Sequence, residues 1–123
     1  MRRFTCALLA GLAIDALACG VCIDDKVASC YDHALVERAR AGGNEVAFFA
    51  IQGALPQNEA TRAILRKAVE ATPGVLRASG RVSVENAALS FAYDPRRGNA
   101  LAIALQLERR LPSGVTLALL RVM

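Results

Sequence analysis

Four residues near the start of the chain could bind a metal ion: Cys19, Cys22, Cys30 and His33. Cys19 and Cys22 have the two-residue spacing that lets both sulfurs face one ion, and the intervening glycine lets the backbone fold around it. Thiolate favours Cu(I) and Zn(II), and imidazole suits both. The pattern predicts a soft-metal site with Cys19 and Cys22 as primary ligands. Cys30 and His33 are possible helpers, Cu(I) is the suspected ion and Zn(II) is the alternative.

The elements around these residues decide whether they can share one ion. Residues 22–41 carry apolar side chains at three- and four-residue steps, which predicts a helix that ends at the following pair of glycines. On a straight helix Cys22 and His33 lie roughly 16 Å apart at 1.5 Å per residue. They could share a metal only if the chain before about Asp24 folds back. Cys30 and His33, three residues apart, would be neighbours on one helix face and could form a second, two-ligand site.

Each of these residues also has an interpretation without a metal. Cys19 and Cys22 could form a disulfide in an oxidising compartment. Cys30 could be a small apolar side chain in the core, and His33 an ordinary, partly exposed helix residue. Three cysteines remain once Cys6 leaves with the N-terminal segment, and an odd number argues against a purely structural disulfide framework.

The first eighteen residues have the pattern of a secretory signal peptide. Two arginines precede an apolar run from Phe4 to Ile14, and the segment ends on Ala16-Leu17-Ala18. The apolar run is shorter than the roughly 20 residues that span a bilayer. Cleavage after Ala18 would make Cys19 the first residue of a periplasmic or secreted protein. A lipid on Cys19 is the alternative, and we expect contact with a membrane only in that case.

The composition argues against several classes of function. The chain has 123 residues, of which 54% are hydrophobic, so we expect one compact folded domain. Tryptophan is absent and the net charge of +4 is spread along the chain, so we expect no nucleic-acid partner. There is one histidine and no nucleophile elbow, Walker loop or His-Glu-x-x-His motif. We therefore expect that the protein is not an enzyme.

The rest of the chain predicts the order strand, helix, strand, strand, helix, strand. Val46–Ile51 is a continuous apolar run of strand length, and Asn58 can cap a helix that ends near Ala71. The apolar residues of that helix are expected to be buried, and they are Ala60, Ile64, Leu65, Ala68 and Val69. Residues 76–85 alternate between apolar and polar, as in a strand with one buried face. A returning strand with Leu89, Phe91 and Tyr93 on one face, a helix over 99–111 and a strand over 115–122 complete the order.

This order predicts an α+β fold, the ferredoxin-like βαββαβ sandwich, with a four-stranded antiparallel sheet and two helices on one face. The helix over 22–41 would be an extra N-terminal element leading into it. The predicted organisation is a secretory signal peptide over 1–18, a cysteine-containing helical segment over 19–44 and the ferredoxin-like domain over 45–123.

Residues 46–122 resemble the heavy-metal-associated domain family. The resemblance rests on Pro73-Gly74-Val75, on Val82-Ser83-Val84 and on the run from Phe91 to Pro95. It implies the ferredoxin-like fold and metal handling. The family's metal site is a Met-x-Cys-x-x-Cys loop between the first strand and the first helix. Here the loop is Gln52 to Asn58 without a cysteine, so no ligand is carried over to it.

Three hypotheses for function follow. The first is a periplasmic or secreted metallochaperone-like protein that holds or transfers copper through Cys19 and Cys22, with another periplasmic metal-handling protein as its partner. The second is a thiol–disulfide module in which one of these cysteines attacks a partner's disulfide. The third is a non-catalytic interaction domain with structural cysteines, which docks a partner on its open sheet face or edge strand.

Overall fold

The computed structural model describes residues 23–123. The predicted signal peptide over 1–18 and the predicted ligands Cys19 and Cys22 lie outside the described residues, and the domain boundaries at 18 and 44 stay predictions. Within residues 23–123, no helix is both long and apolar enough to cross a membrane.

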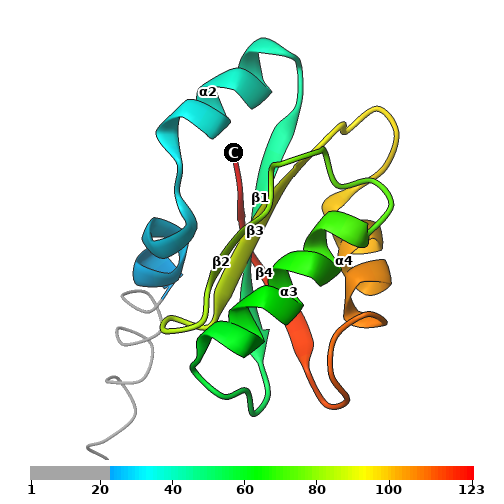
Figure 1. The fold of residues 1–123 in the computed structure, drawn as a ribbon. Helices are drawn as coiled ribbons and strands as arrows, with labels where there is room; N and C mark the ends of the chain where they lie inside the picture. Colours follow the sequence, from blue (N-terminus) through cyan, green and yellow to red (C-terminus); the bar gives the residue numbers. More distant parts are fainter. Residues whose placement is uncertain (1–22) are drawn as a thin grey trace, which may run out of the picture.

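The predicted order of elements is confirmed. Residues 23–30 are helical and are followed by α2, and the remaining elements alternate in the βαββαβ order (Figure 1). The bounds are α2 His33–Ala41, β1 Glu45–Gln52, α3 Glu59–Ala71, β2 Arg81–Ser83, β3 Ala88–Tyr93, α4 Ala100–Glu108 and β4 Thr116–Val122.

The four strands form one antiparallel sheet in the order β2-β3-β1-β4. The continuous apolar run of β1 is central, and Phe49 lies opposite Leu89 on β3 and Leu119 on β4. A central strand is covered on both faces, which is why β1 is apolar along nearly its whole length. The predicted ferredoxin-like α+β fold is confirmed.

Helices α3 and α4 pack on one face of the sheet, where Phe49 and Phe91 stack with their ring centroids 5.4 Å apart. Asn58 and Asn99 cap the two helices, accepting hydrogen bonds from the amides of Thr61 and Ala102. The buried face predicted for α3 is wrong at two residues, because its contact stripe runs through Thr61, Leu65, Ala68 and Val69 and leaves Ala60 and Ile64 exposed.

The opposite face of the sheet is covered by helix 23–30 and α2, so the fold has helices on both sides of the sheet (Figure 1). Val27 and Val36 of these helices share a buried cluster with Val46 and Phe48 of β1. The expectation of an open sheet face for docking is therefore wrong over the central strands.

The predicted continuous helix over 22–41 is also wrong, because the chain breaks at Tyr31 and Asp32. Asp32 has an extended backbone, with φ −125° and ψ 107°, and its carboxylate accepts the amide hydrogen of Leu35 as the cap of α2. An aspartate in this position favours the start of a new helix over the continuation of the previous one.

The strand predicted over 76–85 is shorter than expected, since only Arg81–Ser83 form β2. Ala78 has a positive φ of 60°, which turns the chain, and Ser79 is buried. The Ser79 hydroxyl donates to the carbonyl of Leu76 and accepts from the amide of Ala92. This side chain takes the hydrogen bonds that a regular strand would have made with its backbone.

Candidate functional site

Cys30 is a free thiol in the core between helix 23–30 and the sheet, with 4% of its surface exposed. Burial raises the pKa of the Cys30 thiol above its ordinary value of 9.0, and hydrogen bonds from Ser29 and from the Ser83 backbone offset this only in part. The thiol is therefore protonated at neutral pH and shielded from solvent. In this state it is neither a metal ligand nor a nucleophile.

His33 lies in different surroundings, as the exposed first residue of α2. Its Nδ1 lies 3.2 Å from the Tyr31 hydroxyl, and the two rings are tilted at 46° to each other. Because the chain breaks between Cys30 and His33, the two are not neighbours on one helix face, and that prediction is wrong. No group of three or more His, Cys, Asp or Glu side chains within residues 23–123 is arranged to hold a metal ion.

The loop between β1 and α3 is closely packed at one end of the sheet. Gly53 has a φ of +119°, and a Cβ built on it would lie 2.6 Å from the carbonyl oxygen of Gly114. Leu55 packs against the core beneath the loop, next to an apolar cavity of about 140 Å³ that Leu65 and Val84 also line. This loop therefore contains no cysteine or histidine, and its leucine is used in packing.

The first turns of helix 23–30 lie at that same end of the sheet. Lys26 donates through Nζ to the carbonyl oxygens of Asn86 and Ala87 in the turn between β2 and β3. Ala87 also accepts a hydrogen bond from the amide of Ile51, close to the end of β1. Gln57 of the loop donates to the carbonyl of Glu85, in the same turn. The β2–β3 turn thus connects the N-terminal helix with the β1–α3 loop.

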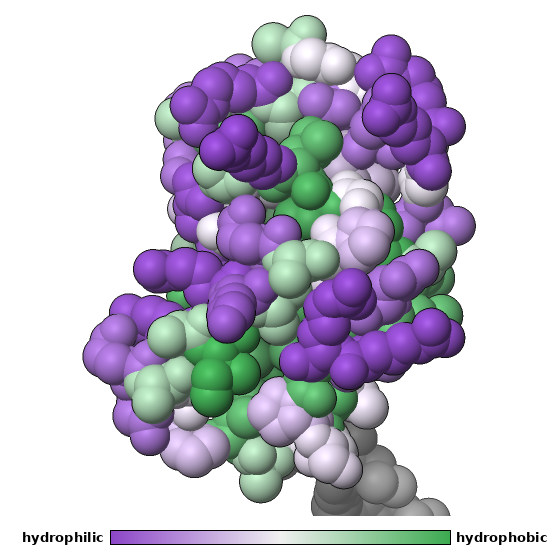
Figure 2. All heavy atoms as spheres, turned by 45° about the vertical axis from the view of Figure 1, so that its right-hand side comes forward, coloured by the Kyte–Doolittle hydropathy of each residue, from purple (hydrophilic) through white to green (hydrophobic). Residues whose placement is uncertain are grey.

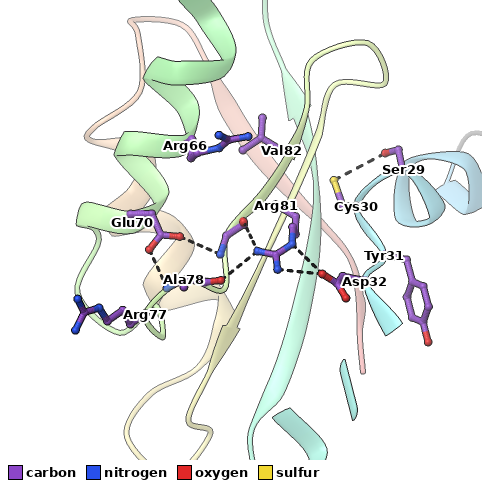
Figure 3. A pocket seen from close by; sticks show the side chains of 11 residues that line it. Ser29, Cys30, Tyr31, Asp32, Arg66, Glu70, Arg77, Ala78, Arg81 and Val82 are labelled. Atoms are coloured by element: carbon purple, nitrogen blue, oxygen red, sulfur yellow. Dashed lines mark hydrogen bonds and ion pairs between the residues drawn. The ribbon is translucent and has the colours of Figure 1, made fainter. Parts of the chain in front are cut away.

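A second candidate site was not predicted from the sequence. It is a cavity of about 880 Å³ at the outer edge of β2, which residues 29–32, α3 and the 77–80 turn also line. Figure 3 shows Arg81 at its centre, paired with Asp32, and Glu70 opposite. These residues come from three separate stretches of the chain, so no local spacing in the sequence could have identified the cavity.

No family model matches the sequence, and no curated protein matches it. Solved structures do match the fold. The chain is similar to a copper-binding domain from HMA7, a P-type ATPase, with a TM-score of 0.51 and 15% identity over 63% of this chain and 96% of that one. It is similar to oxidized MerP from Ralstonia metallidurans CH34, with a TM-score of 0.50 and 13% identity over 63% of this chain and 99% of that one. The resemblance to the heavy-metal-associated domains is confirmed for the fold.

Proposed function

We propose that this protein binds Cu(I) through Cys19 and Cys22 and holds it or passes it to a second metal-handling protein. Two thiolates form a low-coordinate site that suits Cu(I), and incoming thiols of a partner can replace them one at a time. The similarity of the fold to a copper-binding domain supports a role with this metal.

One observation carries the proposal: helix 23–30, which follows Cys22 directly in the sequence, has its first turns at the same end of the sheet as the β1–α3 loop. In the resembled family that loop carries the two cysteines. Here the loop has none, while a cysteine pair with the same spacing precedes the helix. We infer that the N-terminal pair takes over the function of the loop at the same end of the domain.

The positions of Cys30 and His33 are compatible with binding of the ion at the N-terminal pair. Cys30 is buried with a raised thiol pKa, so it does not compete with the N-terminal pair for the ion. His33 is exposed beside Tyr31 and is not required by the proposal. The body of the domain serves as a scaffold that presents the pair and is not itself an enzyme.

Titration of the reduced protein with Cu(I), in competition with a chromogenic chelator, tests the proposal. We expect about one tight equivalent, and we expect the double variant C19S/C22S to lose it. The matched variant Cys30→Ala should keep the full affinity. Binding that survives in C19S/C22S would overturn the proposed site, and preference for Zn(II) over Cu(I) would overturn the proposed metal. Reduction of insulin disulfides without Cu(I) binding would instead support the thiol–disulfide module.

We also propose that the protein acts in the periplasm or outside the cell after cleavage behind Ala18. The signal-like composition of residues 1–18 supports this location. Mass spectrometry of the protein isolated from cells gives the mature N-terminus directly. A chain that starts at Cys19 without a lipid is expected, whereas a chain that starts beyond Val21 would remove Cys19 and contradict both proposals.

A further inference from the structure

The outer edge of β2 has no strand beside it, because β2 is the terminal strand of the β2-β3-β1-β4 sheet. The cavity of about 880 Å³ lies along this edge, between α3 on one side and residues 29–32 on the other. It therefore occupies the place of a fifth strand. An unpaired strand edge is a common docking position for an extended peptide.

Only part of this edge is covered by the protein itself. At Gly80, just before β2, the amide donates to Glu70 and the carbonyl accepts from Arg81, so this part of the edge is occupied. Backbone groups of alternate residues point to the same edge of an antiparallel strand, so those of Val82 face the cavity like those of Gly80. Those of Arg81 point the other way, to β3. The Arg81 side chain is held aside, because its guanidinium donates to Asp32 and to the carbonyls of Ala78 and Gly80.

The charges around the cavity favour an acidic ligand. Arg66 on α3 and Arg77 before β2 make no hydrogen bond or ion pair with other groups in the described chain, and both are exposed (Figure 3). The acidic groups of the cavity are already engaged. Glu70 accepts from the amides of Ala78 and Gly80, and Asp32 is paired with Arg81. Two unpaired guanidinium groups thus remain for a ligand.

The arrangement of the two arginines favours an extended ligand over a small anion. Figure 3 shows Arg66 beside Val82 and Arg77 beyond Ala78, with the Glu70 carboxylate between them. A single phosphate or carboxylate placed between the arginines would meet Glu70. A peptide along the strand edge can instead place separate carboxylates near each arginine and keep neutral groups beside Glu70.

We propose that the outer edge of β2 binds an extended, acidic peptide segment of a partner protein. The segment pairs with the backbone at Val82 and directs its carboxylates to Arg66 and Arg77. This inference does not depend on metal binding, and its test uses the reduced, metal-free protein.

The test measures binding of fluorescent peptides by anisotropy, with a peptide of alternating valine and glutamate as the probe. The same valine–glutamate peptide with every backbone amide N-methylated has the same charge but no N–H donor for a strand pair. The variant R66E/R77E reverses both free charges of the cavity. The variant R40E/R109E is the matched control, since it makes the same change of charge at exposed positions that do not line the cavity.

We expect saturable binding of the valine–glutamate peptide, a loss of at least about tenfold in R66E/R77E and less than about twofold in R40E/R109E. The N-methylated peptide should bind at least about tenfold more weakly, and the backbone amide of Val82 should shift in NMR spectra with the first peptide only. Equal binding of both peptides, equal losses in both variants, or no saturable binding would each overturn the proposal. Tighter binding of inorganic tripolyphosphate than of either peptide would assign the cavity to a small anion and overturn it as well.

Discussion

The carboxylate of Asp32 joins two parts of the chain that are 49 positions apart in the sequence, because one of its oxygens accepts from Arg81 Nε at 3.2 Å and from Nη2 at 3.0 Å. The other oxygen accepts the amide hydrogen of Leu35 at 3.1 Å. The hydrogen bond from the Leu35 amide and then that from Arg81 lower the pKa of Asp32 below its ordinary 3.8. One side chain therefore starts α2 and ties the N-terminal layer to β2.

Two substitutions of Asp32 separate these roles. Asp32→Asn keeps an acceptor for the Leu35 amide but loses the charge opposite Arg81, whereas Asp32→Ala loses both. We expect melting temperatures in the order wild type, Asp32→Asn, Asp32→Ala. The folded pKa is lowered, so the contribution of the charge is complete above the ordinary 3.8 and is lost as the pH falls through the folded value.

Thermal unfolding, followed by circular dichroism, checks this order at neutral pH. Below pH 3.8 the difference between the wild type and Asp32→Asn should decrease, because the charge of Asp32 is lost. Asp25→Ala is the matched control, since Asp25 is exposed and makes no ion pair with any residue from 23 to 123. Equal melting temperatures for Asp32→Ala and Asp25→Ala would show that the Asp32 contacts do not stabilise the fold.

The buried Cys30 thiol should react slowly in the folded protein. Its raised pKa and 4% exposure leave little accessible thiolate at neutral pH. We expect alkylation by iodoacetamide, followed by peptide mapping, to modify Cys30 only after addition of denaturant. Modification at the same rate with and without denaturant would contradict the placement of Cys30 in the core.

The same thiol makes stability depend on alkaline pH. A raised folded pKa means that the contribution of Cys30 is complete below the ordinary value of 9.0 and is lost as the pH rises from there through the folded value. Cys30→Ala should cost about 1 kcal/mol of unfolding free energy at neutral pH through the lost packing. It should also reduce the decrease of the unfolding free energy at alkaline pH, which urea unfolding at increasing pH measures.

Tyr93 should titrate well above the ordinary pKa of a tyrosine. Burial and a 2.6 Å hydrogen bond from the Tyr93 hydroxyl to Glu45 raise the pKa of Tyr93 from 10.0 to about 12. The stabilising contribution is therefore complete below pH 10.0 and is lost as the pH rises through about 12. A titration of phenolate absorbance should show a step near pH 12 that disappears in Tyr93→Phe. A spectrum in which Tyr93→Phe instead removes a step near pH 10.0 would contradict the buried hydrogen bond.

Replacement of Gly53 by alanine should destabilise the protein more than replacement of Gly114, although both glycines have a positive φ. At Gly53 a Cβ would lie 2.6 Å from the Gly114 carbonyl oxygen, whereas at Gly114 a Cβ would meet nothing within 4 Å. We expect Gly114→Ala to cost about 1 kcal/mol for the backbone conformation alone, and Gly53→Ala to cost at least about 1 kcal/mol more because backbone must move. Urea unfolding of both variants measures the difference, and equal costs would contradict the close packing of the two loops.

The sequence predicted those elements whose signals are local. The apolar run of β1, the cap Asn58 and the helical pattern over 99–111 all lead to the observed elements. Each of these signals depends on neighbours a few positions away along the chain, so no tertiary contact is needed to interpret it.

The features that the sequence did not predict depend on distant partners. Asp32 breaks a helix whose apolar spacing continues through it, and its charge is satisfied by Arg81 on another strand. Ser79 turns inward because its hydroxyl accepts a hydrogen bond from the backbone amide of Ala92. The cavity at β2 forms only when α3 and residues 29–32 meet the same strand edge. The spacing of residues along the chain does not indicate which distant residues come into contact.

The coordination sphere of bound Cu(I) tests the central claim most directly. X-ray absorption at the copper edge counts the sulfur ligands of the loaded, reduced protein and measures their distances. The account predicts two sulfurs in the wild type, an unchanged spectrum in Cys30→Ala, and loss of the sulfur signal in C19S/C22S. A sulfur signal that persists in C19S/C22S, or that changes in Cys30→Ala, would contradict the assignment of the ion to Cys19 and Cys22.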